Sequence, residues 1–118
     1  MNRKAVIFGI KGYKLTNKEI SFFKKNKPWG IILFSRNIKN INQLKKLISK
    51  IKRIFHDQKY PIMIDQEGGK VSRINKIMDL GFFSQDFFGR LYNKDKKLFN
   101  LFYKIYIKKI SEIFNKVG

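Results

Sequence analysis

One ten-residue stretch carries most of the chemistry that this sequence offers. It runs Ile64-Asp65-Gln66-Glu67-Gly68-Gly69-Lys70-Val71-Ser72-Arg73 and follows a short apolar run. Asp65 can accept hydrogen bonds and Arg73 can donate them, so together they suit the hydroxyl groups of a sugar. Equally, the two residues could belong to a charged turn, in which Asp65 caps nearby backbone and pairs with Arg73. The residues alone leave both interpretations open.

The double glycine and Glu67 fit a loop that approaches a ligand. Gly68 and Gly69 allow the backbone to turn sharply and to come close to a bound molecule. Glu67 has the chemistry of a general acid or base. In parallel α/β folds, functional groups gather at the carboxyl ends of the strands, and Asp65 directly follows an apolar run. This position favours Asp65 as a ligand-binding residue.

The residue inventory excludes several other kinds of site. The chain has no cysteine, which excludes disulfides, a thiolate zinc site and a catalytic thiol. Its single histidine, His56, excludes an imidazole-rich metal centre. No apolar run approaches the ~20 residues that a membrane-spanning helix needs. The apolar stretch near the N-terminus is too short for a signal-peptide core, so we expect a cytoplasmic protein with no membrane partner.

The net charge raises the possibility of a nucleic-acid partner. The 118 residues include 27 Lys and Arg against 8 Asp and Glu, a formal charge of +19. Only 5 of the 27 are arginine, the residue whose planar fork suits phosphates and bases. Lysine, asparagine, isoleucine and phenylalanine are abundant while alanine occurs once, as an AT-rich coding sequence would produce. We therefore expect a solvated surface without a specific nucleic-acid partner. A basic, non-enzymatic module that binds nucleic acid or another polyanion is the alternative.

Hydrophobic patterning predicts strands that alternate with helices. Short apolar runs typical of parallel strands buried on both faces occupy residues 4–9, 29–34 and 60–65. The capping patterns Thr16-x-x-Glu19 and Asn40-x-x-Gln43 open two amphipathic helices, the second with a regular apolar stripe. Residues 66–93 are expected to form a loop. A long helix over residues 94–116 follows, with Gly118 as its C-cap. Its expected inner side consists of Phe102, Ile105, Tyr106, Ile110, Ile113 and Phe114.

This order predicts an α/β fold with parallel strands and right-handed crossovers. Three strands cannot close a barrel, and a doubly wound sheet usually has about five. The pattern is therefore either a minimal open sheet or the opening portion of something larger.

Several stretches resemble one known family. The opening AVIFGI, then NKPWGIILFSRNI, NINQL, PIMIDQEGGKVSR and FFGRLY are similar to the N-terminal part of bacterial β-N-acetylhexosaminidases of glycoside hydrolase family 3. The resemblance implies an incomplete TIM (β/α)8 barrel, with the first three β/α units and a long C-terminal helix. Residues 1–118 would be the N-terminal part of that domain, truncated at its C-terminus.

The same resemblance assigns roles to the motif. Asp65 and Arg73 match the residues that hold the terminal N-acetylglucosamine, and Glu67, Gly68 and Gly69 support the loop. The implied reaction is the retaining hydrolysis of terminal β-linked N-acetylglucosamine from peptidoglycan-derived sugars in cell-wall recycling, with no metal or other cofactor.

The sequence also departs from the family pattern. Lys70 stands where the family usually has arginine, and residues 74–88 lack the family's prolines. The nucleophilic aspartate and the acid/base histidine of the family's Lys-His-x-Pro-Gly-His-Gly loop would lie beyond residue 118, and His56 is outside any such motif. We therefore expect no catalytic residue in these 118 residues and no activity from them alone.

Overall fold

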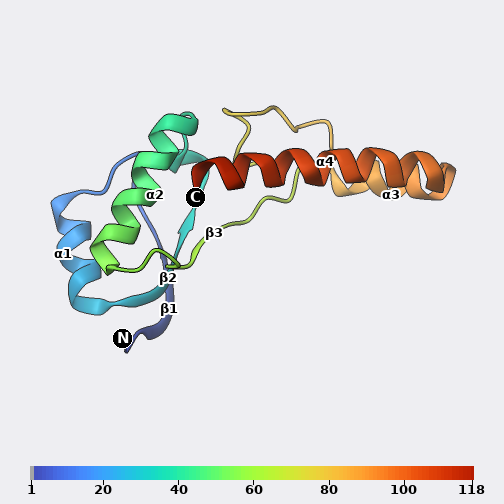
Figure 1. Cartoon of the computed structure of the whole chain (residues 1–118). Coiled ribbons are helices and arrows are strands. Elements are labelled where there is room, and N and C mark those ends of the chain that lie inside the picture. Colours follow the sequence, from blue (N-terminus) through green and yellow to red (C-terminus); the bar gives the residue numbers. More distant parts are fainter. Residues whose placement is uncertain (1) are drawn as a thin grey trace.

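Three parallel strands form one small sheet in the computed structural model, which describes residues 2–118 (Figure 1). The strands are β1 (Lys4–Gly9), β2 (Pro28–Leu33) and β3 (Ile62–Ile64), in the order β1-β2-β3. Ile32 pairs with Met63 across β2 and β3. The third strand is shorter than the predicted 60–65 at both ends. Pro61, just before it, has no N–H to donate, although its carbonyl accepts from the Ile31 N–H at 3.0 Å, and Asp65, just after it, belongs to the following loop. The predicted parallel α/β arrangement is confirmed.

Two capped helices connect the strands. Helix α1 (Asn17–Asn26) begins at the predicted capping box: the Glu19 N–H donates to the Thr16 hydroxyl, and the Thr16 N–H donates to the Glu19 carboxylate at 2.8 Å. The short 3-10 helix η1 (Ser35–Asn37) precedes α2 (Ile41–Phe55), whose N-cap Asn40 accepts from the Gln43 N–H. The reciprocal bond differs from the prediction, since the Gln43 side chain accepts from the Lys39 N–H.

The helices cover one face of the sheet. Phe8, Ile31 and Leu33 pack into the core with the apolar side chains of α1 and α2. Ile7, whose side chain points to the opposite face, is 45% exposed. The expectation that all three strands are buried on both faces is therefore wrong. An apolar run by itself does not say how many of its faces receive a covering helix.

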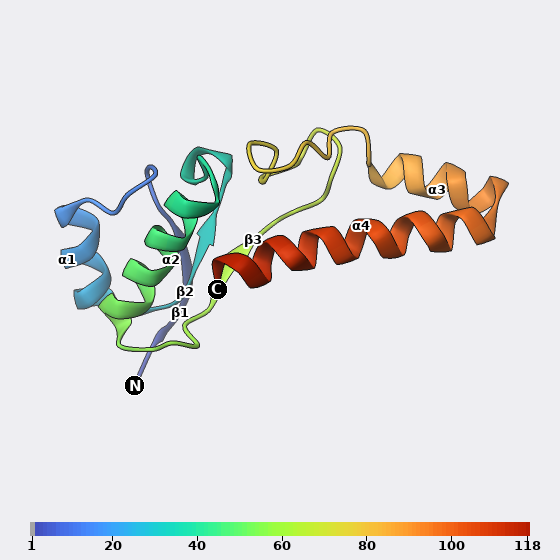
Figure 2. The ribbon, with the colours of Figure 1, turned by 45° about the horizontal axis from the view of Figure 1, so that its top comes forward.

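Residues 85–118 form a helical hairpin that extends away from the sheet (Figure 2). Helix α3 (Gln85–Lys94) lies beside α4 (Lys96–Val117). The molecule is accordingly elongated, with principal extents of 52 × 27 × 21 Å. The expected loop over 66–93 is wrong for its last part, where Ser84 caps α3 by accepting from the Phe87 N–H at 3.0 Å.

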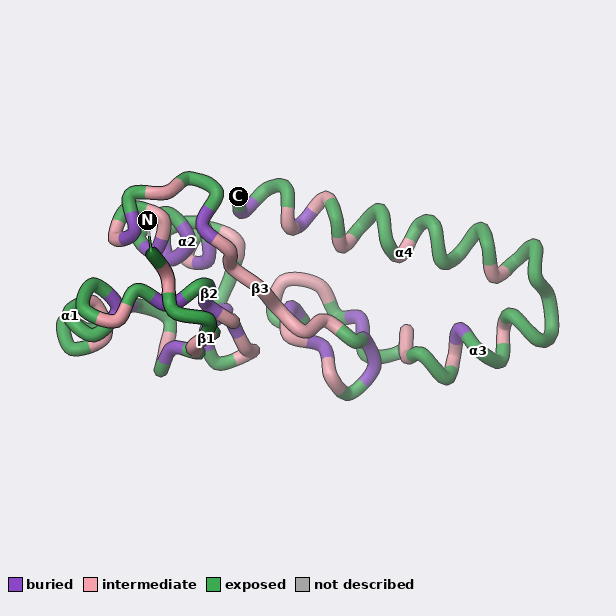
Figure 3. The backbone as a smooth tube through the Cα atoms, turned by 90° about the horizontal axis from the view of Figure 1, so that it is seen from below, coloured by how far each residue is buried: buried purple, intermediate pink, exposed green. Residues whose placement is uncertain are grey.

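Only the C-terminal part of α4 reaches the core. Ile113 and Val117 are buried, and Gly118 ends the helix with a positive φ of 101°, as predicted. Further toward the N-terminus of α4, Phe102 and Ile105 are 41% and 52% exposed, so their assignment to the inner side is wrong. Figure 3 shows mostly exposed residues along this part of the helix. The sheet ends before it can cover that part of α4.

Candidate functional site

Gln66 organises the loop that follows β3. Its side-chain oxygen accepts from the Arg73 N–H at 2.8 Å and from the Ile74 N–H at 3.3 Å, while its side-chain nitrogen donates to the Ser72 hydroxyl at 3.1 Å. Ile74 and Ser72 are both buried. One side chain therefore ties the two ends of the loop together. The sequence analysis missed this role because a glutamine in a polar loop has no distinguishing local pattern.

The double glycine makes the turn that its residue types predict. Gly68 and Gly69 have φ angles of 86° and 57°, in the region that favours glycine. A Cβ atom at Gly68 would collide with the carbonyl oxygen of Phe83, and one at Gly69 would lie 2.8 Å from the Ser84 Cβ. The Val71 N–H donates to the Gly68 carbonyl at 3.2 Å and closes the turn. The backbone of this loop therefore packs directly against the segment that leads into α3.

Asp65 and Arg73 form a two-pronged ion pair at the carboxyl end of β3. Arg73 Nε donates to Asp65 Oδ1 and Arg73 Nη2 donates to Asp65 Oδ2, both at 2.8 Å. The side chains are 39% and 26% exposed, so both remain accessible to a ligand. The hydrogen bond from Arg73 lowers the pKa of Asp65, and Asp65 in turn raises the pKa of Arg73. Asp65 is thus held as a hydrogen-bond acceptor rather than as a proton donor.

A second cluster, at the end of β2, borders this pair. The guanidinium carbon of Arg73 lies 5.5 Å from the centre of the Phe34 ring, and that of Arg36 lies 4.5 Å from it. Arg36 Nε also donates to the Ile10 carbonyl at 3.0 Å. The fully buried Asn37 donates to the same carbonyl and accepts from the Phe34 N–H. These residues connect the ends of β1 and β2 to the ion pair.

The sequence reasoning assigned no function to Phe34, Arg36 or Asn37. A signal was nevertheless present: Phe34 ends the second apolar run and is followed at once by Ser35-Arg36-Asn37, just as Asp65 ends the third. In a parallel sheet both positions lie at the same edge.

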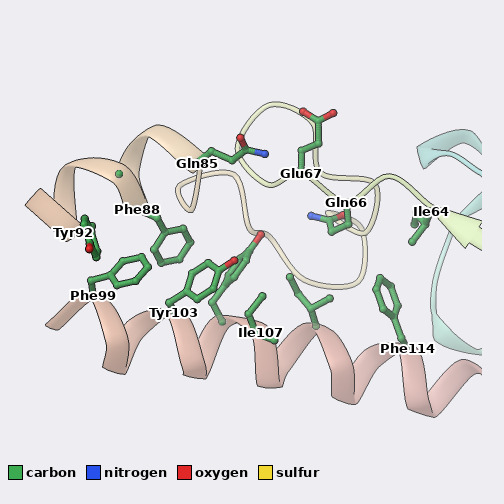
Figure 4. Close-up of a pocket in the computed structure, with 13 residues that line it drawn as sticks. Ile64, Gln66, Glu67, Gln85, Phe88, Tyr92, Phe99, Tyr103, Ile107 and Phe114 are labelled. Carbon is green, nitrogen blue, oxygen red and sulfur yellow. The ribbon is translucent and has the colours of Figure 1, made fainter. Parts of the chain in front are cut away.

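Neither Glu67 nor His56 forms a hydrogen bond with the ion pair, although the charge of Glu67 helps to raise the pKa of Arg73. Figure 4 shows the Glu67 carboxylate directed away from α4, whereas Gln66 is directed into the space between the loop and that helix. Glu67 is exposed, and its carboxylate takes part in no hydrogen bond or ion pair among residues 2–118. His56 is the left-handed C-cap of α2, at the end of the helix that leads toward the start of β3. It lies at the opposite edge of the sheet from Asp65.

An aromatic cavity of about 740 Å³ separates the loop from the helical hairpin (Figure 4). Three of its lining residues, Gln66, Glu67 and Gln85, have amide or carboxylate side chains. The other lining residues come mainly from α3 and α4 and are Ile64, Phe88, Gly89, Tyr92, Phe99, Tyr103, Tyr106, Ile107, Ile110 and Phe114. Neither Asp65 nor Arg73 lines it. The cavity is therefore a neighbour of the ion pair and not part of it.

Two further properties concern only the described part of the chain. Within residues 2–118, no three His, Cys, Asp or Glu side chains come together in a group that could bind a metal ion. Over the same residues, no helix has the length and hydropathy required to cross a membrane.

Comparisons with known proteins agree on one family. A β-hexosaminidase of Psychromonas ingrahamii is 39% identical over 70 residues, which cover 59% of this chain and 20% of that protein. The structure of NagZ from Neisseria gonorrhoeae matches with a TM-score of 0.65 and 35% identity, over 79% of this chain and 27% of that one. A glycoside hydrolase family 3 β-N-acetylglucosaminidase from Paenibacillus sp. str. FPU-7 matches at 30% identity with a TM-score of 0.51, over 57% of this chain and 13% of that one. No family model matches.

The chain is similar to the N-terminal part of the family 3 β-hexosaminidases. It spans about a fifth of the length of the curated relatives and about a quarter of the NagZ chain. NagZ of N. gonorrhoeae has also been solved in complex with N-trifluoroacetyl-D-glucosamine, and its similarity to this chain there is 34% identity with a TM-score of 0.64. The resemblance of the sequence to this family is confirmed.

Proposed function

We propose that this chain provides the sugar-binding part of a β-N-acetylhexosaminidase, with Asp65 and Arg73 holding a terminal N-acetylglucosamine. The observation that carries the proposal is their two-pronged ion pair at the carboxyl end of β3, in a chain related to β-hexosaminidases. A sugar hydroxyl can donate to the Asp65 carboxylate and accept from Arg73 at the same time. Gln66 fixes the backbone of Arg73, and the Gly68-Gly69 turn, next to Glu67, supports the loop.

We also propose that residues 1–118 form the first three β/α units of a TIM barrel, followed by a long helix. Helices cover only one face of the sheet, which supports a barrel over a doubly wound sheet, where helices cover both faces. In a barrel, helices cover the outer face and the inner face of each strand points toward the other strands. Here helices cover the face of Ile31 and Leu33, while Ile7 on the opposite face stays exposed. That opposite face would be the interior of the barrel.

The proposed substrate class is peptidoglycan-derived sugars with a terminal β-linked N-acetylglucosamine, cleaved with retention during cytoplasmic cell-wall recycling. Retaining hydrolysis needs a nucleophile and a proton donor that flank the glycosidic bond. Asp65 is committed to Arg73 and its pKa is lowered by that hydrogen bond, which disfavours a proton-donor role. Glu67 lies two residues away on the same loop and has no partner there to orient it. We therefore propose that these 118 residues bind the sugar without hydrolysing it.

The test combines a binding assay and a hydrolysis assay on the 118-residue chain. Saturation-transfer NMR should detect N-acetylglucosamine with the wild type and lose most of that signal in Asp65→Asn. Asp86→Asn is the matched control, because it removes the same charge from an exposed Asp–Arg pair on α3. No release of chromophore from a chromogenic β-N-acetylglucosaminide is expected. Equal binding by both variants would contradict the sugar site, and turnover that is abolished by Glu67→Gln would make the loop itself catalytic.

One observation favours a second candidate function, the binding of a polyanion. A groove of about 680 Å³ along α2 is lined by five cationic side chains and no acidic one. The cationic residues are Lys14, Lys39, Lys46, Lys50 and Arg53. A salt titration with oligonucleotides of different sequence separates the two functions. A binding module should retain affinity and some preference at physiological salt, whereas non-specific attraction should fall steeply and equally for all sequences.

A further inference from the structure

Phe34, the first residue after β2, contacts the ion pair of the sugar site through its ring. The ring centre lies 5.5 Å from the guanidinium carbon of Arg73. This distance is within the ~6 Å over which the negative face of an aromatic ring attracts a cation. Phe34 is half-buried, so the contact lies where the core meets the surface. The ring is therefore placed to act on Arg73 from the side of β2.

Buried contacts fix the position of Phe34 itself. Its N–H donates to the Asn37 side chain at 2.9 Å, and its carbonyl accepts from the Asn37 N–H at 2.8 Å. Asn37 is fully buried, and its side chain donates to the carbonyls of Ile10 and Gly12, both at 3.0 Å. The ring lies against the end of β1, where a Cβ on Gly9 would be 3.3 Å from Phe34 Cε2. Phe34 thus provides a fixed surface.

The hydrogen bonds between Asp65 and Arg73 leave one motion of the guanidinium unrestricted. They hold one edge of the planar group, but the plane can still tilt about the line that joins the two bonds. Asp65 accepts from two of the five N–H donors of Arg73, and the other three have no partner among residues 2–118. Contact with the Phe34 ring opposes the tilt. A leucine could fill the same space, but it has no negative ring face.

We infer that Phe34 is a positioning residue of the sugar site, whose ring sets the tilt of the Arg73 guanidinium and so directs its three remaining N–H donors toward the bound sugar. The inference rests on the proposed function, because those donors need a ligand. Phe34 acts through Arg73 and does not contact the sugar. Arg36 helps to hold the ring: its guanidinium carbon lies 4.5 Å from the ring centre, and its Nε donates to the Ile10 carbonyl.

Variants of Phe34 in the 118-residue chain test the inference through two measurements. Phe34→Leu should weaken the binding of N-acetylglucosamine, measured by NMR titration, roughly two- to fivefold, as expected for the loss of one cation–aromatic contact. It should also raise the Asp65 pKa, measured from the carboxyl ¹³C shift, toward the ordinary 3.8, because a tilting guanidinium makes weaker hydrogen bonds. Phe34→Met also lacks a ring and should repeat both effects. Phe34→Tyr keeps the ring, so its affinity should stay within about twofold of the wild type and its Asp65 pKa should stay lowered.

Phe22→Leu is the matched control, because it makes the same substitution in an exposed ring on α1 that packs against Phe8. It should change neither the affinity nor the Asp65 pKa. Unchanged affinity in Phe34→Leu would overturn the inference while the sugar site stands, and so would an equal loss of affinity in Phe34→Tyr. Weaker binding by Phe34→Leu with an unchanged Asp65 pKa would show that Phe34 contacts the sugar directly, which contradicts a positioning role. If the wild type binds no N-acetylglucosamine, the proposed function fails together with the inference.

Discussion

At the scale of single residues, the Asp65–Arg73 pair is better explained by recognition than by stability. Exposed ion pairs add little to the free energy of folding. This pair is nevertheless aligned through two hydrogen bonds and braced by the contact between Gln66 and the Arg73 backbone. Such alignment is useful where a ligand must meet an acceptor and a donor at fixed positions. The alternative interpretation, a charged turn, predicts the same Asp65–Arg73 contacts but no bound ligand.

The pair should give the chain a stability component that depends on pH. Arg73 lowers the pKa of Asp65 in the folded state. The contribution of the pair to the free energy of unfolding is therefore fully present above pH 3.8, the ordinary carboxyl pKa. It should disappear as the pH falls through the lowered folded value. Urea unfolding of the wild type and Asp65→Asn at a series of pH values measures it. The difference between the two proteins should be constant at neutral pH and shrink below pH 3.8. A difference that stays constant to the most acidic pH would contradict this origin.

At the scale of elements, α3 is a helix that its aromatic residues and its glycine made difficult to predict from the sequence. Ser84 provides an N-cap and Asp86 lies in the first turn, both of which favour a helix start. The Phe87-Phe88-Gly89 sequence instead suggests a loop, because glycine disfavours a helix interior. The helix forms because Phe88 is buried against aromatic side chains of α4, including Tyr103 at a ring distance of 5.0 Å. Tertiary packing therefore overrides the local propensity.

Replacement of Gly89 by alanine should stabilise the protein. A Cβ at this helical position would meet no atom within 4 Å, so the substitution improves helix propensity without a clash. The expected gain in the free energy of unfolding is about 0.5–1 kcal/mol, measured by chemical denaturation. Gly68→Ala is the opposite case, since its positive φ and the Phe83 carbonyl leave no room for a Cβ. It should destabilise by roughly 1–3 kcal/mol. Destabilisation by Gly89→Ala would show that α3 does not form as described.

At the scale of the whole molecule, exposed apolar surface and net charge have opposite effects on self-association. The open face of the sheet and the projecting half of α4 expose large apolar side chains, among them Leu101 at 56% and Ile105 at 52%. Exposed apolar patches and unpaired strand edges favour association. The net charge of +19 favours separate molecules by mutual repulsion, and salt weakens that repulsion.

The 118-residue chain should therefore self-associate increasingly as salt rises. Sedimentation velocity between about 20 and 500 mM NaCl measures this, and the weight-average sedimentation coefficient should increase over a range where the Debye length falls well below ~10 Å. Leu101→Lys should reduce the association. Asn100→Lys is the matched control, because it adds the same charge at an exposed polar position of α4. A single monomer peak at all salt concentrations, with cooperative thermal unfolding, would contradict the prediction.

The features that depend on neighbouring residues could be predicted from the sequence. The capping box of Thr16 and Glu19, the apolar stripe of α2 and the C-cap at Gly118 are formed as predicted. The turn at Gly68-Gly69 also follows from residue type, since only glycine adopts those φ angles without strain. These features were predictable because each depends on residues within a few positions of one another.

Which surfaces meet became clear only from the packing of the folded chain. In the folded chain, one face of the sheet is uncovered, and Phe102 and Ile105 are exposed. Phe34 and Arg36 lie beside Arg73, which is 37 positions further along the chain than Arg36. Each of these outcomes depends on how segments far apart in sequence pack, and no local pattern encodes that packing. The residues of the candidate ion pair were therefore recognisable from the sequence, but their alignment and the neighbouring Phe34–Arg36 contact required the fold.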